Sequence, residues 1–509
     1  MKFNRRTRRN SKDFNFSSIY NTSSRNSLYA SNMLTSKKFD KLEDLRSNLH
    51  LAFKTGNVEE LRNISRYFFR ISGIYARTVR YLAYMPTYSY YLLPHIHGLS
   101  INASNVKREL VNQLQFLDTI NLETVLPSIA VDTIVDGVSY VYFRKKGKKA
   151  GIQKLPLEFC RVGSIVDGFP TVEFNLDYFD TFGTYEEKLR AAAVMPPEIT
   201  YEWTILEENK IKSKREIKSA FGNWIALDSN KATAFYYNPS LQPLLANSFF
   251  SFIDVMQLKG VEKKKAENTM YNLVVQKFPL NDDSEPVFDI SEIASLHQGA
   301  VSIFADNPST DVLSTMADVS NIDLNKSSAD PIDFEPWEKD IYSDLGVSSQ
   351  LFSTEGNMAL EKSIQVDESL VLQLVKKFEN WLDMIIKDQF NERTRDENFT
   401  FDFNIIPVTN LNRKDMIKTY QEMATFGYSK MLPALAAGQK QLQILSMAVF
   451  ENDVLGLQEA MTPLQSSNQT SFNEKGNDGK TGRPQKDISE LSDKTIANIE
   501  SGDSSARKV

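Results

Sequence analysis

The chain has 509 residues, of which 41% are hydrophobic and 24% charged, with a formal net charge of −6 at pH 7. This length exceeds one ordinary core and predicts about three domains. The single cysteine, Cys160, excludes an internal disulfide and a cysteine-rich zinc site. No apolar run reaches the ~20 residues of a membrane span. The acidic balance argues against a protein that coats nucleic acid.

The first 36 residues form a basic segment that is rich in Arg, Asn and Ser and has no apolar periodicity. We expect this segment, and the polar tail at 466–509, to be disordered. Six basic residues precede the first acid, Asp13: Lys2, Arg5, Arg6, Arg8, Arg9 and Lys12. Two interpretations stay open, a solvated tail or an arm that contacts nucleic acid or an acidic partner. The segment lacks the apolar core of a signal peptide.

A capping pair predicts where the first long helix begins. Asn57 is followed by Glu60, an arrangement typical of a helix N-terminus. Apolar residues then recur every three or four positions and predict one buried face: Leu61, Ile64, Phe68, Ile71, Tyr75, Val79 and Leu82. Beside it runs a basic i, i+4 stripe of the kind found on solvated faces: Arg62, Arg66 and Arg70. Further helices are predicted at 104–120 and 122–135.

The periodicity then changes to two, which predicts a β-containing section. Alternating segments lie on either side of a hairpin turn at Lys146–Lys148. A second pair of strands is predicted around Asp167-Gly168. Residues 198–228 alternate again and carry Trp203 and Trp224, so we expect strands there as well.

An apolar helix follows, and Pro243 suits its first turn. One face of this helix is apolar: Leu245, Phe249, Phe252, Ile253 and Met256. Lysines gather toward its C-terminal end: Lys259, Lys263, Lys264 and Lys265. Residues 271–329 are irregular, with the strand-like sequences YNLVVQKFPL and GAVSIFAD. They predict a small α/β excursion between two helices.

The chain returns through a second helix, which Pro336 opens and Gly346 ends as the C′ residue. Three apolar residues lie four apart on one face of it: Trp337, Ile341 and Leu345. The next stretch, LGVSSQLFSTEGNMAL at 345–360, predicts a loop of small polar residues.

A long helix is predicted from 359 to 390, with an apolar face that runs from Leu360 to Ile385. The sequence NFTFDFNIIP then predicts a strand with one buried face, because alternate positions are apolar: Phe399, Phe401, Phe403 and Ile405. Helices at about 411–426 and 439–452 close the folded part.

Candidate catalytic motifs are few. Gly479-Lys480-Thr481 ends like a phosphate-binding loop, but position 474, where that loop needs Gly, is Glu. His95 and His97 have no further ligand at matched spacing and fit loop histidines better than a metal site. Cys160 is expected to be a small buried residue. These motifs give no positive support for a catalytic residue, a metal site or a cofactor, but they do not exclude an enzyme.

The order of these elements resembles that of the portal proteins, the head–tail connectors, of tailed double-stranded DNA bacteriophages. The resemblance covers residues 57–460 and includes the sequences LPLEFCRVGSIVDGFPTVEFNLDYF, QPLLANSFFSFIDVMQLKGVEKKKAE and DLGVSSQLFSTEGNMALEKSI. It implies an α+β, mainly helical portal fold that assembles as a ring. The implied parts are a basic arm (1–36), wing (37–241), first stem helix (242–267), clip (268–330), second stem helix (331–345), tunnel loop (346–359), second wing part (360–410), crown helices (411–465) and tail (466–509).

The resemblance further implies that about twelve subunits form a channel at one capsid vertex, through which viral DNA is packaged and ejected. The implied partners are other copies of the chain, double-stranded DNA, a terminase motor, the major capsid or scaffolding protein, and head–tail connector proteins. The resemblance implies that the protein is not an enzyme, with no catalytic residue, metal or cofactor, and that it binds no membrane. The implied location is the portal vertex of the virion, after assembly in the host cytoplasm.

Three sets of site residues follow from the resemblance. The tunnel loop would present small side chains that slide along DNA without a fixed contact: Ser348, Ser349, Gln350, Ser353, Thr354, Gly356 and Asn357. Gly346 and Gly356 would act as hinges. The stem lysines that would face the channel are Lys259, Lys263 and Lys264.

Two other classes of protein stay open: another virion structural or adaptor protein, and a metal-dependent enzyme that processes nucleic acid. We expect a closed ring for a reason independent of the resemblance. A single subunit should leave the apolar faces of residues 245–256 and 337–345 poorly covered, and neighbouring copies would then cover them.

Overall fold

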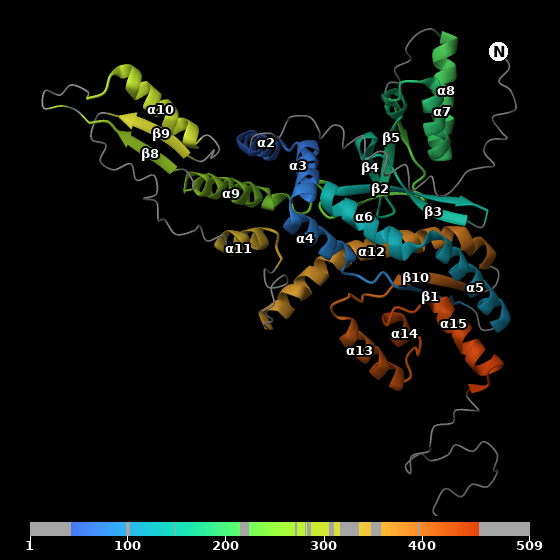
Figure 1. Cartoon of the computed structure of the whole chain (residues 1–509). Helices are drawn as coiled ribbons and strands as arrows, with labels where there is room; N and C mark the ends of the chain where they lie inside the picture. Colours follow the sequence, from blue (N-terminus) through green and yellow to red (C-terminus); the bar gives the residue numbers. More distant parts are fainter. Residues whose placement is uncertain are drawn as a thin grey trace, which may run out of the picture. The chain divides into compact units, whose positions relative to one another are not determined.

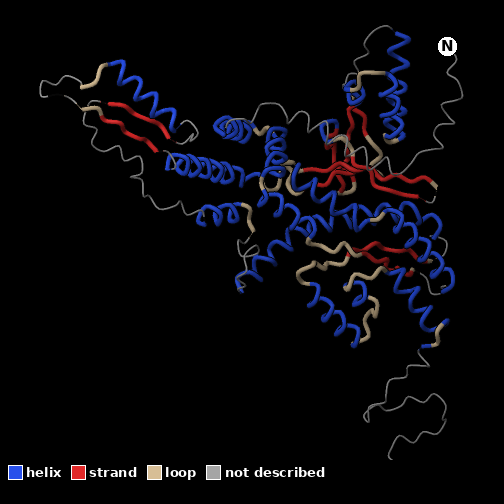
Figure 2. The backbone as a smooth tube through the Cα atoms, viewed as in Figure 1, coloured by secondary structure: helices blue, strands red, loops and turns tan. Residues whose placement is uncertain are grey.

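The computed structural model describes residues 42–97, 102–147, 149–213, 223–269, 272–279, 281, 287–304, 310–315, 335–347, 358–394 and 398–457. These residues form a mainly helical α+β protein with four small sheets (Figure 1, Figure 2). The chain divides into two units, Met1–Met447 and Ala448–Val509, and all sites below lie in the first. Among the described helices, none combines the length and the apolar character that crossing a membrane requires.

The N-terminal helices are α2 (Leu42–Thr55), α3 (Val58–Ile71) and α4 (Gly73–Tyr84). The predicted cap is confirmed, since the Asn57 side chain accepts from the Glu60 N–H. The expectation of one continuous helix is wrong. Ser72 adopts extended backbone angles and its hydroxyl accepts from the Tyr75 N–H, which starts a new helix there. The predicted apolar positions are buried except Ile71, which is 48% exposed at the break.

Two further helices lie where the periodicity predicts them: α5 (Ala103–Ile120) and α6 (Leu122–Asp136). Asn121 separates them with a φ of 55°. This left-handed conformation is one that Asn tolerates better than most residues. The predicted boundaries are therefore confirmed to within one residue at each end.

The arginine stripe of α3 is partly buried at Arg62 and Arg66, where it anchors α6, and is not the solvated face that we predicted. The Arg62 Nε donates to the Asp136 carbonyl oxygen at 2.7 Å. The Arg66 Nε donates to Asp136 Oδ1 at 2.6 Å, and its Nη1 reaches Glu158 Oε1 at 3.2 Å. Only Arg70 remains exposed. Sequence spacing placed these side chains on one face, but the end of α6 lies against that face.

Two antiparallel sheets follow. One has the strand order β3 (Lys149–Lys154), β2 (Val138–Lys146) and β7 (Ala232–Tyr236), and the other has β4 (Cys160–Val166), β5 (Phe169–Asn175) and β6 (Trp224–Ala226). Both predicted turns are confirmed. Asp167 and Gly168 have φ values of 51° and 84°, which two-residue hairpin turns require.

The expected strands at 198–228 are mostly wrong. The helix α8 (Pro197–Ser213) occupies the first half of this range, and of the described residues there only β6 (Trp224–Ala226) is a strand. Two shorter helical elements precede it: η5 (Leu176–Thr181) and α7 (Tyr185–Val194). Ile199 and Trp203 are buried one helical turn apart, and the Trp203 ring lies 4.9 Å from that of Phe179. A spacing of four satisfies both a helix and an alternating strand, so the pattern alone did not separate them.

The long helix α12 (Met358–Thr394) and the strand β10 (Phe399–Ile405) form the C-terminal half of the main core. β10 pairs antiparallel with β1 (Tyr90–Ile96), and its burial alternates as predicted. Two carboxylates of α12 fix the strand. Glu379 accepts from the Ile405 N–H at 3.0 Å and Asp383 from the Phe403 N–H at 2.8 Å.

Residues 272–315 form the predicted α/β excursion, with a corrected internal order. β8 (Asn272–Lys277) and β9 (Thr310–Thr315) are parallel, and α10 (Ile290–Phe304) connects them. GAVSIFAD, which we expected to be a strand, lies largely in α10. Parallel strands need a crossover connection, and an apolar helix supplies it.

The last elements are α13 (Arg413–Thr425), α14 (Leu432–Ala436), α15 (Gln441–Val449) and a π-helical turn (Phe450–Val454). Helices were predicted in the first and third of these places, whereas α14 was missed. The Gln441 side chain accepts from the Leu92 N–H at 2.8 Å and donates back to its carbonyl at 3.2 Å. This pair joins α15 to strand β1.

Candidate functional site

The candidate site lies between two helices that bracket residues 272–315. They are α9 (Phe249–Thr269), preceded by the turn η6 (Ala246–Ser248), and α11 (Glu335–Asp344). We predicted Pro243 in the first turn of this helix, but it lies six residues before the first residue of α9. Its carbonyl accepts from the Ala246 N–H, so Pro243 opens the short turn that precedes the helix.

The two helices pack against each other and against the N-terminal helices. Ile341 and Leu345 of the α11 segment are 1% and 6% exposed. On α9, Phe249 and Phe252 lie within 5.4 Å and 5.3 Å of the Phe68 ring of α3. Aromatic contacts of this kind add to the free energy that burial supplies. The core of the helix pair is therefore built within one chain.

This packing corrects the expectation that a single subunit leaves residues 245–256 and 337–345 poorly covered. Five apolar side chains on or before α9 are buried in the isolated chain: Leu245, Phe249, Phe252, Ile253 and Val255. Helices α2, α3 and α4 cover them, which the sequence did not predict because these helices lie nearly 200 residues away. Trp337, at 39% exposure, is the large apolar side chain left open on α11.

The lysines follow the last buried turn of α9. Lys259 and Lys263 lie four residues apart and both are exposed. The side chain of Lys264 is outside the described residues. Which surface these side chains line in an assembly stays a prediction.

Gly346 ends α11 as predicted. Its φ is +70°, its N–H donates to the Ser343 carbonyl, and the Val347 N–H donates to the Tyr342 carbonyl. This pair of hydrogen bonds is the Schellman arrangement, in which glycine takes the left-handed position without strain. Its role as a hinge stays a prediction. The other hinge and the loop residues lie outside the described residues: Ser348, Ser349, Gln350, Ser353, Thr354, Gly356 and Asn357.

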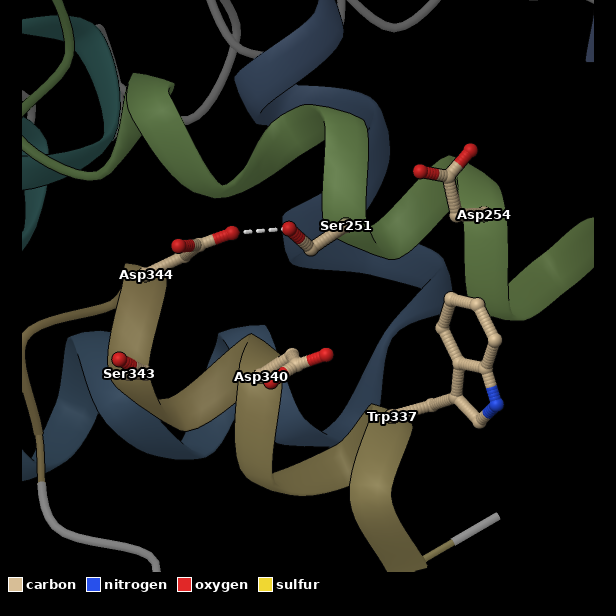
Figure 3. Close-up of a pocket in the computed structure, with 6 residues that line it drawn as sticks. All are labelled: Ser251, Asp254, Trp337, Asp340, Ser343 and Asp344. Carbon is tan, nitrogen blue, oxygen red and sulfur yellow. Dashed lines mark hydrogen bonds between the residues drawn. The ribbon is translucent and has the colours of Figure 1, made fainter. Parts of the chain in front are cut away.

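A pocket of about 280 Å³ lies between α9 and α11. Figure 3 shows it with Trp337 at one end and Asp344 at the other, on the same helix. Its lining is mainly acidic and hydroxylic: Ser251, Asp254, Trp337, Asp340, Ser343 and Asp344. The sequence WEKDIYSD already places Trp337, Asp340 and Asp344 at i, i+3 and i+7 on one helix face. That signal was available and was not used.

The electrostatics of this pocket are unbalanced. Arg46 of α2 pairs with Asp254 at 2.6 Å, where both side chains are partly exposed. Ser251 donates a hydrogen bond to Asp344. No hydrogen bond or ion pair to Asp340 is found within the described chain. Of the three carboxylates, Asp254 is thus the one with an ion pair to a cation of the described chain.

Residues with catalytic potential lie elsewhere and are not brought to this pocket. We expected His95 to lie in a loop, but it lies in strand β1. The centroid of its ring is 4.4 Å from that of the His97 ring. His97 Nε2 lies 3.1 Å from the Thr400 hydroxyl. Cys160 is buried, as predicted, and burial raises the pKa of its thiol. Among the described residues, no three His, Cys, Asp or Glu side chains are grouped to hold a metal ion.

No family model matches the chain, and no curated protein matches it.

Proposed function

We propose that the protein is a portal-like ring subunit, which forms a channel for double-stranded DNA at a capsid vertex. The observation that carries this proposal is the arrangement around α9 and α11. Two helices pack side by side, a βαβ unit is inserted between them, and a small polar segment joins α11 to a 37-residue helix, α12. That is the order in which the resemblance puts stem, clip, stem, tunnel loop and wing helix.

The charges fit a conduit. A wall that grips DNA would gain free energy from each phosphate contact through counterion release and would resist movement of the duplex. The chain has a net charge of −6, and the two described exposed lysines of α9, Lys259 and Lys263, lie toward its C-terminal end. The channel, its partners and its virion location belong to this proposal, and the terminase motor would be a separate chain.

Negative-stain electron microscopy of the purified full chain tests the proposal. The expected result is a closed ring with a central hole and a mass of about twelve chains, measured in parallel by mass photometry. A monodisperse monomer at micromolar concentration and physiological salt would overturn it. Closed particles without a hole would favour another virion structural protein, and metal-dependent cleavage of DNA would favour a nuclease.

A further inference from the structure

The acidic pocket between α9 and α11 has the chemistry of a receptor for an organic cation. Asp340 and Asp344 lie one turn apart on α11 and are both exposed, and neither pairs with a cation of the described chain. Figure 3 shows the Trp337 ring at one end of the pocket, with Asp340 between it and Asp344. An aromatic ring next to carboxylates binds a guanidinium or ammonium group through its face and through charge.

The lining favours a side-chain cation over a bare metal ion. Divalent metals need several ligands at fixed short distances. The described residues contain no such group of three, and Trp337 supplies no ligand atom. A guanidinium, by contrast, is weakly hydrated and is bound by stacking together with carboxylate pairing.

The chain itself has basic side chains in the segment that leads into α2, next to the pocket. Arg46 contacts the pocket wall at Asp254, and α2, to which Arg46 belongs, begins at Leu42, where the described chain starts. The segment before Leu42 is therefore attached about one helical turn from the pocket. Six basic residues stand in residues 1–12, before the first acid of the sequence.

The chain between residues 1–12 and Leu42 is long enough for the basic residues to reach the pocket. A coil of roughly 30 residues has an end-to-end distance of about 30 Å, so residues 1–12 can reach a site near Leu42. A tether of this length also keeps the two groups at an effective concentration on the order of millimolar. A weak contact of two or three ion pairs is then enough to populate the docked state.

We propose that the basic segment of residues 1–12 docks in the acidic pocket of its own chain, with an arginine against Trp337 and Asp340 and a second basic side chain paired with Asp344. This inference does not rest on the proposed conduit function. It assigns the basic segment an acidic intramolecular partner instead of nucleic acid.

Limited trypsin digestion of the full chain tests the docking. Mass spectrometry follows cleavage after Arg5, Arg6, Arg8 and Arg9. We expect this cleavage to be about tenfold faster in an Asp340→Asn/Asp344→Asn variant than in the wild type. The reason is that a few surface ion pairs together change the equilibrium constant of docking by about a factor of ten. Trp337→Ala should show part of this effect. The matched control is Glu186→Gln/Glu202→Gln, which removes two exposed carboxylates from α7 and α8. Equal cleavage rates in all four proteins would overturn the proposal.

Carbodiimide cross-linking supplies the second measurement. It joins amines to carboxylates at contact distance, so Lys2 and Lys12 should be linked to Asp340 or Asp344 within monomer mass. Replacing Arg5, Arg6, Arg8 and Arg9 by Gln should lower the yield of these links, while thermal unfolding stays unchanged. Intramolecular docking would be overturned by links only to other regions or only between chains. It would also be overturned by tryptic protection that needs added DNA and persists in the pocket variant.

Discussion

The helical body around α12 and the βαβ unit of residues 272–315 differ in how far their apolar side chains are buried. In α12 one apolar face from Val371 onward is closed to solvent: Val371, Leu374, Val375, Phe378, Trp381, Leu382, Ile385 and Ile386. In α10, which is also apolar, Ile290 and Ile303 are 76% and 75% exposed, and Leu296 and Val301 are close to half exposed.

The difference lies in the number of layers. Strand β10, strand β7 and helix α4 all contact α12, and Glu379 and Asp383 fix β10 to it by hydrogen bonds. Among the described elements, the main contact of α10 is strand β9 of a two-stranded parallel sheet. A two-stranded sheet covers only one side of the helix, so apolar side chains on the other side of α10 stay exposed. Apolar composition alone therefore does not predict burial.

The largest test of this comparison replaces Trp381 by Ala. The Trp381 ring is fully buried and contacts Phe235 edge-on with 5.5 Å between ring centroids, so we expect a loss of about 3–5 kcal/mol in the free energy of unfolding. Urea denaturation measures it. The matched variant Ile303→Ala in α10 should change stability by less than about 0.5 kcal/mol. A comparable loss at Ile303 would show that another surface covers α10.

The second test removes the anchor between α3 and α6. Arg66→Met leaves the carboxylate of Asp136, whose side chain is only 17% exposed, without its main partner. Burial raises the pKa of Asp136, and Arg66 opposes that shift. We expect a loss of about 2–4 kcal/mol in thermal or urea unfolding. Arg70→Met, at the exposed end of the same stripe, is the control and should be nearly neutral, and Asp136→Asn should partly rescue Arg66→Met.

The third test uses pH on the buried face of α12. Burial raises the pKa of Asp367 from 3.8 to about 6, although Tyr81 donates a hydrogen bond to it. The folded chain therefore binds the proton more tightly than the unfolded chain, and this group contributes stability that is present below about pH 4 and lost as pH rises through 6.

Asp367→Asn should remove that pH dependence and raise the free energy of unfolding at pH 7 by about 2–3 kcal/mol, because a shift of one pKa unit corresponds to 1.36 kcal/mol. Unfolding curves between pH 4.5 and 7.5 provide the comparison. Asp388→Asn, on the exposed side of the same helix, should keep the wild-type slope. An unchanged slope in Asp367→Asn would mean that the carboxyl group reaches solvent.

The smallest effect on stability is expected at the exposed end of α9. Replacing Lys259, Lys263 and Lys264 together by Ala should change the free energy of unfolding by no more than about 0.5 kcal/mol, since exposed lysines contribute little. If they line a channel, DNA packaging or retention should change, and more strongly at low salt. Ring images and packaged DNA are the two measurements. Collapse of the ring would show that these lysines pair with acids across a subunit interface.

Local chemistry in the sequence determined many element ends. The Asn57 cap, the turn at Asp167-Gly168 and the C′ glycine Gly346 lie where the sequence predicts them, because each depends on one side chain or one backbone conformation. The alternation in β10 and the periodicity of α12 were equally readable, since each has one buried face. The element order, and with it the resemblance, follows from these signals.

Tertiary structure determined which of these elements pack against one another, and therefore which side chains are buried or paired. A spacing of four fits both a helix and a strand, and α8 is a helix in which Trp203 contacts Phe179 and Ile199 is buried in the same cluster. Tertiary structure also turned Arg62 and Arg66 into anchors for α6, and it brought Arg46 to the acidic pocket on α9 and α11. Burial and ion pairing depend on which distant elements are neighbours, and that information is not contained in the spacing of residues along one element.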